Sequence, residues 1–261
     1  MKVMVFQWPK GAEAARRCPF GPQPRSGAML VLIHVSSIKT RREASILPWC
    51  AFQRIRLRAT SGRSCSAARI TALWPFASFA MVRMLADHIE FTNLGDCRIL
   101  WQRAGFEDVY GFGWSRVTRL DQEVVAEITK LHHARQTDNE VVWRAIAPNI
   151  QANRSWKNLP GGYWILDLTA EGLSHLQIMR LEAAEVKHVL LCTDGYYRAV
   201  DTYHLQTDKS LVEQSAKIGI RQMIQAIRTC ERSDERCVRF PRIKPSDDAT
   251  GVLLCIGGFQ R

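Results

Sequence analysis

The chain has 261 residues, enough for one large domain or for one domain with an appendage, and 46% of them are hydrophobic. No apolar run reaches the roughly 18 residues that a membrane helix needs, so we expect no membrane span. The formal net charge of +11 would suit a nucleic-acid-binding protein if it were spread over the whole chain.

The positive charge belongs to the first 70 residues. They hold 13 Lys and Arg against two acids, whereas the rest of the chain holds 23 basic and 23 acidic residues. We therefore expect a basic, poorly ordered leader over residues 1–74 and a neutral domain over residues 75–258. Nucleic acid could be bound only through residues 1–74.

The leader is rich in Arg and Pro, predicts one strand at 29–35, and has no aspartate before Asp87. Its composition leaves three interpretations open. It could be an organellar transit peptide, an arm that binds nucleic acid, or a segment foreign to the domain, from a start site or reading frame that does not belong to it.

The domain begins with predicted strands at 78–84, 88–93 and 97–101. The residues between the last two strands, 94–96, indicate a tight reversal, so the three strands should form an antiparallel meander with Asp96 at a turn. A helix follows over 120–131, with Asp121 and Glu123 expected in its first turn. Adjacent histidines point to different faces of a helix, so His132 and His133 indicate a solvated helix end rather than a metal pair.

The second half of the domain predicts strands at 163–168, 188–193 and 251–257. The strand at 188–193 is uncharged and mostly apolar, which is typical of a strand buried on both faces. Between the last two strands we expect two helices separated by Gly219, the first capped by Ser210 with Glu213 in a capping box. This succession predicts an α/β sandwich.

The eight cysteines do not form a recognisable metal motif. Cys97, Cys192 and Cys255 lie in strand patterns, where a thiol behaves as a small hydrophobe. Cys230 and Cys237 lack the paired spacing of a structural zinc site. Because no signal peptide is evident, we expect reduced thiols and a cytoplasmic protein.

Acidic residues occur at three predicted strand edges: Asp96 in the early turn, Asp194 directly after the central strand, and Asp247 with Asp248 before the last strand. A buried and unpaired carboxylate costs several kcal/mol, so these side chains should meet a cation. Each motif alone is weak evidence, because Asp is a common turn former. Together, three acidic strand edges suggest one shared cation.

The order of three segments resembles the metal-dependent type 2C family of protein serine/threonine phosphatases. These segments are Asn93–Arg98, Leu190–Gly195 and Ser246–Thr250, and the family's motifs read like N-x-G-D-S-R, L-x-S-D-G and D-N-x-T. The bacterial members are the most similar, given the run Pro160–Trp164. The resemblance covers residues 75–257 and implies two stacked antiparallel sheets flanked by helices.

The resemblance also implies a binuclear Mg or Mn centre that activates water to attack a phosphate ester. By position, Asp194 and Asp247 match main-site metal ligands, and Asp96 matches an acid that shares an additional metal with Asp194. Asp248 stands where the family usually has Asn, and a strand-capping role is the alternative for it.

The chain departs from the family in its first part. The family's Asp-Gly-x-Gly-Gly motif, whose Asp bridges the two metals, has no match here. We expect one weak metal site and impaired hydrolysis of phosphoserine or phosphothreonine in a phosphorylated protein substrate. The alternatives are an inactive pseudophosphatase that binds phosphoproteins, and a nucleic-acid-binding protein that uses the leader. The oligomeric state stays open.

Overall fold

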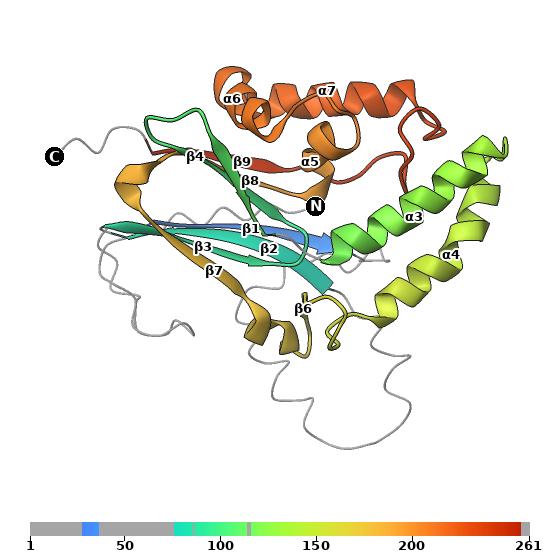
Figure 1. The fold of residues 1–261 in the computed structure, drawn as a ribbon, viewed down its shortest axis with the longest axis horizontal. Coiled ribbons are helices and arrows are strands. Elements are labelled where there is room, and N and C mark those ends of the chain that lie inside the picture. Colours follow the sequence, from blue (N-terminus) through green and yellow to red (C-terminus); the bar gives the residue numbers. More distant parts are fainter. Residues whose placement is uncertain (1–27, 37–75, 86, 114–115, 257–261) are drawn as a thin grey trace, which may run out of the picture.

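The computed structural model describes residues 28–36, 76–85, 87–113 and 116–256, and it shows two antiparallel sheets stacked on each other with helices around them (Figure 1). The strands are β1 (Ala28–Ser36), β2 (Phe76–Met84), β3 (His88–Leu94), β4 (Arg98–Arg103), β5 (Val109–Phe112), β6 (Leu166–Asp167), β7 (Gln177–Glu182), β8 (Val186–Cys192) and β9 (Gly251–Cys255). The helices are α3 (Arg116–His133), α4 (Asn139–Ser155), α5 (Asp194–Asp201), α6 (Asp208–Ile218) and α7 (Ile220–Ser233), with short 3-10 turns at Glu171–His175 and Ala183–Glu185.

The first sheet has the order β1-β2-β3-β7, with β6 paired to the start of β2, and the second has the order β5-β4-β8-β9. The inner faces of the two sheets form one apolar core. Ile89 and Phe91 of β3 pack there against Ile99 of β4 and Leu191 of β8, and all four side chains are fully buried. The predicted α/β sandwich of two stacked antiparallel sheets is confirmed.

From Val189 to Cys192 the central strand β8 is buried on both faces, as this apolar run predicts. Val189 and Leu191 point into the core between the sheets. Leu190 and Cys192 point to the opposite face, where they contact helices. Because side chains alternate along a strand, this double burial requires an uninterrupted apolar run. Each buried aliphatic side chain contributes about 1.5–3 kcal/mol to folding.

The helices form two groups in Figure 1. Helices α5, α6 and α7 cover the outer face of the second sheet, and α3 and α4 form a hairpin that projects to one side. The two predicted helices on either side of Gly219 are α6 and α7, so that prediction is confirmed. The predicted cap is wrong, because Thr207 is the N-cap and Ser210 is the third residue of α6. The two residues form a capping box, in which the side chain of each accepts a hydrogen bond from the backbone N–H of the other. Helices α4 and α5 were not predicted.

The predicted three-stranded meander is wrong, because β4 does not pair with β3. Strand β4 pairs with β5 and β8 in the second sheet. The crossing is made at Gly95, which has φ +89° and lies so close to β2 that a Cβ there would be 2.1 Å from Ser78 Oγ. The backbone N–H of Asp96 donates to the same hydroxyl at 3.1 Å. The turn therefore carries the chain from one sheet to the other.

Other boundaries also differ from the sequence predictions. Helix α3 begins at Arg116, so Asp121 lies beyond its first turn. The predicted strand at 163–168 is reduced to the two residues of β6, and β5 and β7 were not predicted. The predicted strand at 29–35 is confirmed as β1, which pairs with β2 along its whole length. The rest of the leader lies outside the described residues.

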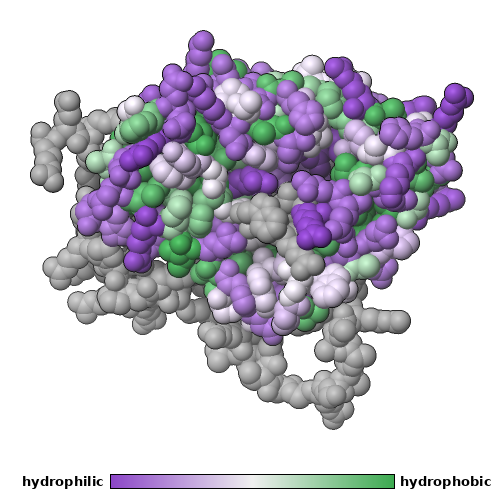
Figure 2. Space-filling view, in the orientation of Figure 1, coloured by the Kyte–Doolittle hydropathy of each residue, from purple (hydrophilic) through white to green (hydrophobic). Residues whose placement is uncertain are grey.

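Hydrophilic residues cover much of the face seen in Figure 2, with hydrophobic ones scattered among them. In the described part of the chain, no helix combines the length and the apolar character that crossing a membrane requires. The cysteines of that part are free thiols, and Cys97 and Cys192 are fully buried, whereas Cys255 is exposed. The two histidines at the end of α3 differ in exposure: His133 is exposed, whereas His132 is half-buried.

Candidate functional site at the acidic end of the second sheet

The register of the second sheet brings the three acidic segments to one end. Cys192, the last residue of β8, pairs with Arg98, the first of β4, and with Gly251, the first of β9. Asp96 lies two residues before Arg98, and Asp194 lies two residues after Cys192. Antiparallel pairing thus places segments from residues 93–98, 190–195 and 246–250 side by side.

Thr193 ties the end of β8 to the segment before β9. Its hydroxyl donates to the carbonyl of Asp248 at 3.0 Å and accepts from the backbone N–H of Thr250 at 3.0 Å. Its own N–H donates to the carbonyl of Thr250, also at 3.0 Å. Next to it, a Cβ on Gly195 would lie 2.4 Å from the carbonyl oxygen of Asp248. The chain needs a glycine here because the two segments leave no room for a side chain.

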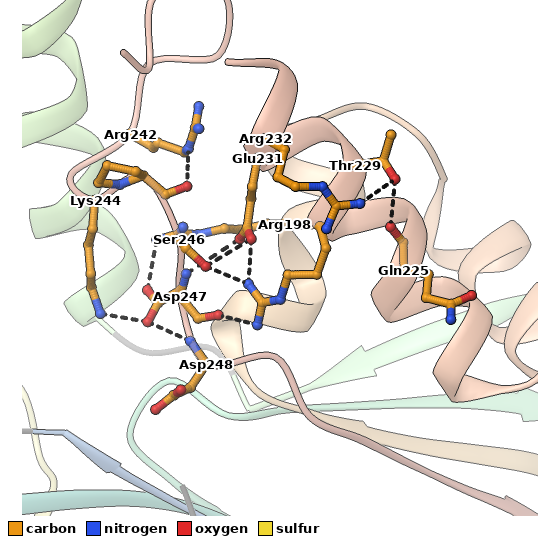
Figure 3. A network of polar contacts seen from close by, with 12 residues as sticks. Arg198, Gln225, Thr229, Glu231, Arg232, Arg242, Lys244, Ser246, Asp247 and Asp248 are labelled. Carbon is orange, nitrogen blue, oxygen red and sulfur yellow. Dashed lines mark hydrogen bonds and ion pairs between the residues drawn. The ribbon is translucent and has the colours of Figure 1, made fainter. Parts of the chain in front are cut away.

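Asp247 is bound by cations of this chain. Its Oδ2 accepts from Arg198 Nη2 at 2.7 Å, and its Oδ1 accepts from Lys244 Nζ at 2.5 Å and from the N–H of Asp248 at 2.9 Å. Figure 3 shows the Lys244 ammonium and the Asp248 backbone converging on this carboxylate. Burial raises the pKa of Asp247, but the charges of Arg198 and Lys244 outweigh it and hold the pKa below the usual range.

Arg198 comes from α5 and faces two of the predicted metal ligands. Its side chain is only 11% exposed. Burial lowers the pKa of Arg198, yet the negative charges of Asp247 and Asp194 reverse this and raise it. A permanently charged guanidinium is therefore paired with Asp247 and feels the charge of Asp194.

Asp121 on α3 is a site residue that the sequence interpretation missed. Removal from bulk water, followed by the charges of Asp96 and Asp194, raises the pKa of Asp121 to about 7, although the residue keeps an exposed surface. Oδ1 of Asp96 is buried and has no hydrogen-bond partner among the described residues. No motif indicated Asp121, and the sequence analysis assigned it only to the first turn of a helix, where the macrodipole favours an acid. Asp121 is recognised only from its position in space, where its charge lies near those of Asp96 and Asp194.

The segment before Asp247 is held by two buried acids at the end of α7. Glu231 accepts from Arg228 Nη1 at 2.5 Å and from Ser246 Oγ at 2.9 Å. Asp234 pairs with Arg242 at 2.7 Å, and both side chains are less than 10% exposed. Arg228 also donates to the carbonyl of Asp247 at 2.7 Å. These bonds fix the irregular chain between α7 and β9 and so fix the position of Asp247.

The four predicted ligands do not form a ready-made metal centre in this arrangement. Across residues 76–85, 87–113 and 116–256, no three or more His, Cys, Asp or Glu side chains are grouped as a metal ion would need. The side chain of Asp248 is exposed and points away from the polar network in Figure 3. A metal role for Asp96, Asp194, Asp247 and Asp248 therefore stays a prediction.

Asp121→Asn should change how stability depends on pH. The folded chain takes up a proton at Asp121 near pH 7, but the unfolded chain does so only near pH 4, so stability should fall as pH rises through this window. Asn removes this slope and should raise the unfolding free energy at pH 8 by about 1–2 kcal/mol, a figure reduced because the side chain is exposed.

Urea unfolding at pH 5 and pH 8 in a chelating buffer measures this effect. Glu123→Gln is the matched control, because Glu123 is an exposed acid on the same helix. An Asp121→Asn variant that keeps the parent's slope between the two pH values would contradict the prediction.

The fold and this end of the sheet define an α/β sandwich with acidic residues from four segments in the neighbourhood of a largely buried arginine. No protein-family model and no curated protein matches the chain.

Solved structures of serine/threonine phosphatases are similar to it at low identity. Stp1 from Staphylococcus aureus is 12% identical, with 90% of this chain and 85% of that one covered and a TM-score of 0.45. A serine-threonine phosphatase 2C from Toxoplasma gondii is 9% identical, with 90% and 86% covered and a TM-score of 0.43. The catalytic domain of the serine/threonine protein phosphatase PstP with two manganese ions is 14% identical, with 87% of each chain covered and a TM-score of 0.39. What this chain does has to be argued from its own residues.

Proposed function

We propose that this chain is a phosphatase-type domain that acts on phosphoserine or phosphothreonine in proteins and whose metal-dependent hydrolysis is impaired. The observation that carries the proposal is the register of β4, β8 and β9. It supports the proposal because three segments that are far apart in sequence, and that resemble the phosphatase motifs in order, come to one end of one sheet.

The impairment follows from the carboxylates at this end. Asp247 is neutralised by Arg198 and Lys244. Removal from bulk water, followed by the charges of Asp96 and Asp194, raises the pKa of Asp121 to about 7. Carboxylate oxygens are the ligands that Mg²⁺ and Mn²⁺ prefer, so these three acids favour a cation, but the described side chains do not supply a complete set.

A second candidate is a binding module that recognises phosphorylated protein without hydrolysing it. The observation that favours it is the Arg198–Asp247 ion pair, which holds a largely buried guanidinium at this end of the sheet. A domain that no longer hydrolyses the phosphate ester can still bind the phosphorylated protein. Binding needs only the cationic side chains at this end of the sheet, and these are present whether or not the reaction occurs.

Phosphate release from a phosphoserine peptide, with and without Mn²⁺, tests the proposal. We expect slow release that requires Mn²⁺ and that falls at least tenfold in Asp194→Asn. Asp108→Asn is the matched control, because this aspartate is exposed and belongs to the turn before β5. Binding of the phosphopeptide without release, in preference to the same peptide unphosphorylated, would instead support the second candidate. Neither release nor selective binding would reject both.

A further inference from the structure

Asp247 is the most buried of the four predicted metal ligands. Its side chain is 4% exposed, whereas Asp96 and Asp194 are partly exposed and Asp248 is exposed. A carboxylate has about four acceptor positions, and this chain uses three of them on Asp247. The donors are the guanidinium of Arg198, the ammonium of Lys244 and the backbone N–H of Asp248. Little of this carboxylate is left for a ligand from solution.

Arg198 cannot readily give way to a metal ion. The guanidinium keeps its charge at every physiological pH, so it cannot leave by losing a proton. Its side chain is nearly as buried as that of Asp247, and breaking a buried ion pair leaves an uncompensated charge. A divalent ion on Oδ2 of Asp247 would also be repelled by the positive charge beside it. Lys244 adds a second cation, although its side chain is 56% exposed and therefore contributes less.

We infer that Arg198, together with Lys244, replaces a divalent metal ion as the counter-ion of Asp247. Any metal ion that this domain binds then lies on the side of Asp96 and Asp194 and does not involve Asp247. The inference holds whether or not the domain acts on phosphoproteins, because it concerns only which cation Asp247 carries. It differs from the role that the resemblance implies for Asp247, and the difference comes from the arginine four residues after Asp194.

Titration of the full chain with Mn²⁺ alone tests the inference. Asp247→Asn should leave the Mn²⁺ affinity of the parent unchanged within twofold. The double variant Arg198→Met and Lys244→Met removes both cations and keeps most of the side-chain bulk. It should bind Mn²⁺ at least tenfold more tightly than the parent, because Asp247 then has no counter-ion.

Two further variants guard against loss of folding. Adding Asp247→Asn to the double variant removes the uncompensated charge and should abolish the gain in Mn²⁺ binding. Arg228→Met serves as the control, since Arg228 bonds to the carbonyl of Asp247 but not to its carboxylate, and it should produce no gain. If the double variant is unstable, its thermal unfolding temperature should rise more on adding Mn²⁺ than the parent's does. Weaker Mn²⁺ binding in Asp247→Asn than in the parent, or no gain in the double variant by either measurement, would overturn the inference.

Discussion

Asp234→Ala should destabilise the domain by about 3–5 kcal/mol, because it removes one partner of a buried ion pair. Arg242 is 3% exposed and would keep its charge with no carboxylate beside it. Asp234 also accepts hydrogen bonds from the backbone N–H groups of Val238, Arg239 and Phe240, and these three donors would lose their acceptor. For a domain of ordinary stability, with an unfolding free energy of about 5–15 kcal/mol, this is a fifth or more of the total.

The effect should depend on pH. Burial raises the pKa of Asp234, but the hydrogen bonds from Arg242 and from the backbone of Phe240 and Arg239 outweigh it and lower the pKa overall. A carboxyl group with a lowered pKa stabilises the fold above its unfolded pKa of about 4, and the contribution is lost as pH falls through the folded pKa. The difference in unfolding free energy between parent and variant should therefore be largest at pH 7 and should become smaller in strong acid.

Urea unfolding monitored by circular dichroism measures this loss. Glu140→Ala is the matched control, because it breaks an ion pair with Arg144 that lies fully in solvent, and it should change stability by less than about 1 kcal/mol. Asp234→Asn should fall between the two, because an amide oxygen still accepts hydrogen bonds but carries no charge. Arg242 also donates to the backbone carbonyls of Asp234, Phe240 and Pro245. A loss below about 1 kcal/mol in Asp234→Ala would show that these carbonyls alone satisfy the guanidinium.

Gly195→Ala should destabilise the domain by about 1–3 kcal/mol, and Gly195→Val by more, because the added atoms overlap the neighbouring backbone. The clash is with the carbonyl oxygen of Asp248 at 2.4 Å, and a backbone atom cannot move aside as the end of a side chain can. The segment before β9 would have to leave the end of β8. The hydrogen bond from the N–H of Thr250 to Thr193 should weaken with it.

Thermal unfolding and amide hydrogen exchange check this prediction together. A loss of 1 kcal/mol lowers the unfolding temperature of a domain of this size by about 2–4 °C. The amide of Thr250 should lose protection, whereas amides in the middle of β8 should not. Gly111→Ala is the control, because its Cβ would meet only Leu100 at an ordinary 3.6 Å. Unchanged protection of the Thr250 amide in Gly195→Ala would contradict the prediction, because it would mean that the two segments accommodate the added Cβ without separating.

The sequence determined the elements whose patterns are local. The uninterrupted apolar run of β8, the alternation of β3 and the break at Gly219 each follow from a few neighbouring residues, and each was predicted. The sequence also determined that acids stand at the ends of strands. Its order of motifs was sufficient to predict an α/β sandwich before any pairing was known.

Tertiary structure decided which strands pair and which charges meet. Nothing near residues 94–96 reveals that β4 leaves the first sheet, because the reason is the close contact of Gly95 with Ser78, sixteen or more residues away. Likewise, Arg198 and Asp247 are 49 residues apart, and only the pairing of β8 with β9 brings them to 2.7 Å. Electrostatic interaction depends on distance in space and on burial, neither of which a local pattern contains. The sequence placed the aspartates at strand ends, and the pairing of β8 with β9 gave Asp247 its counter-ion.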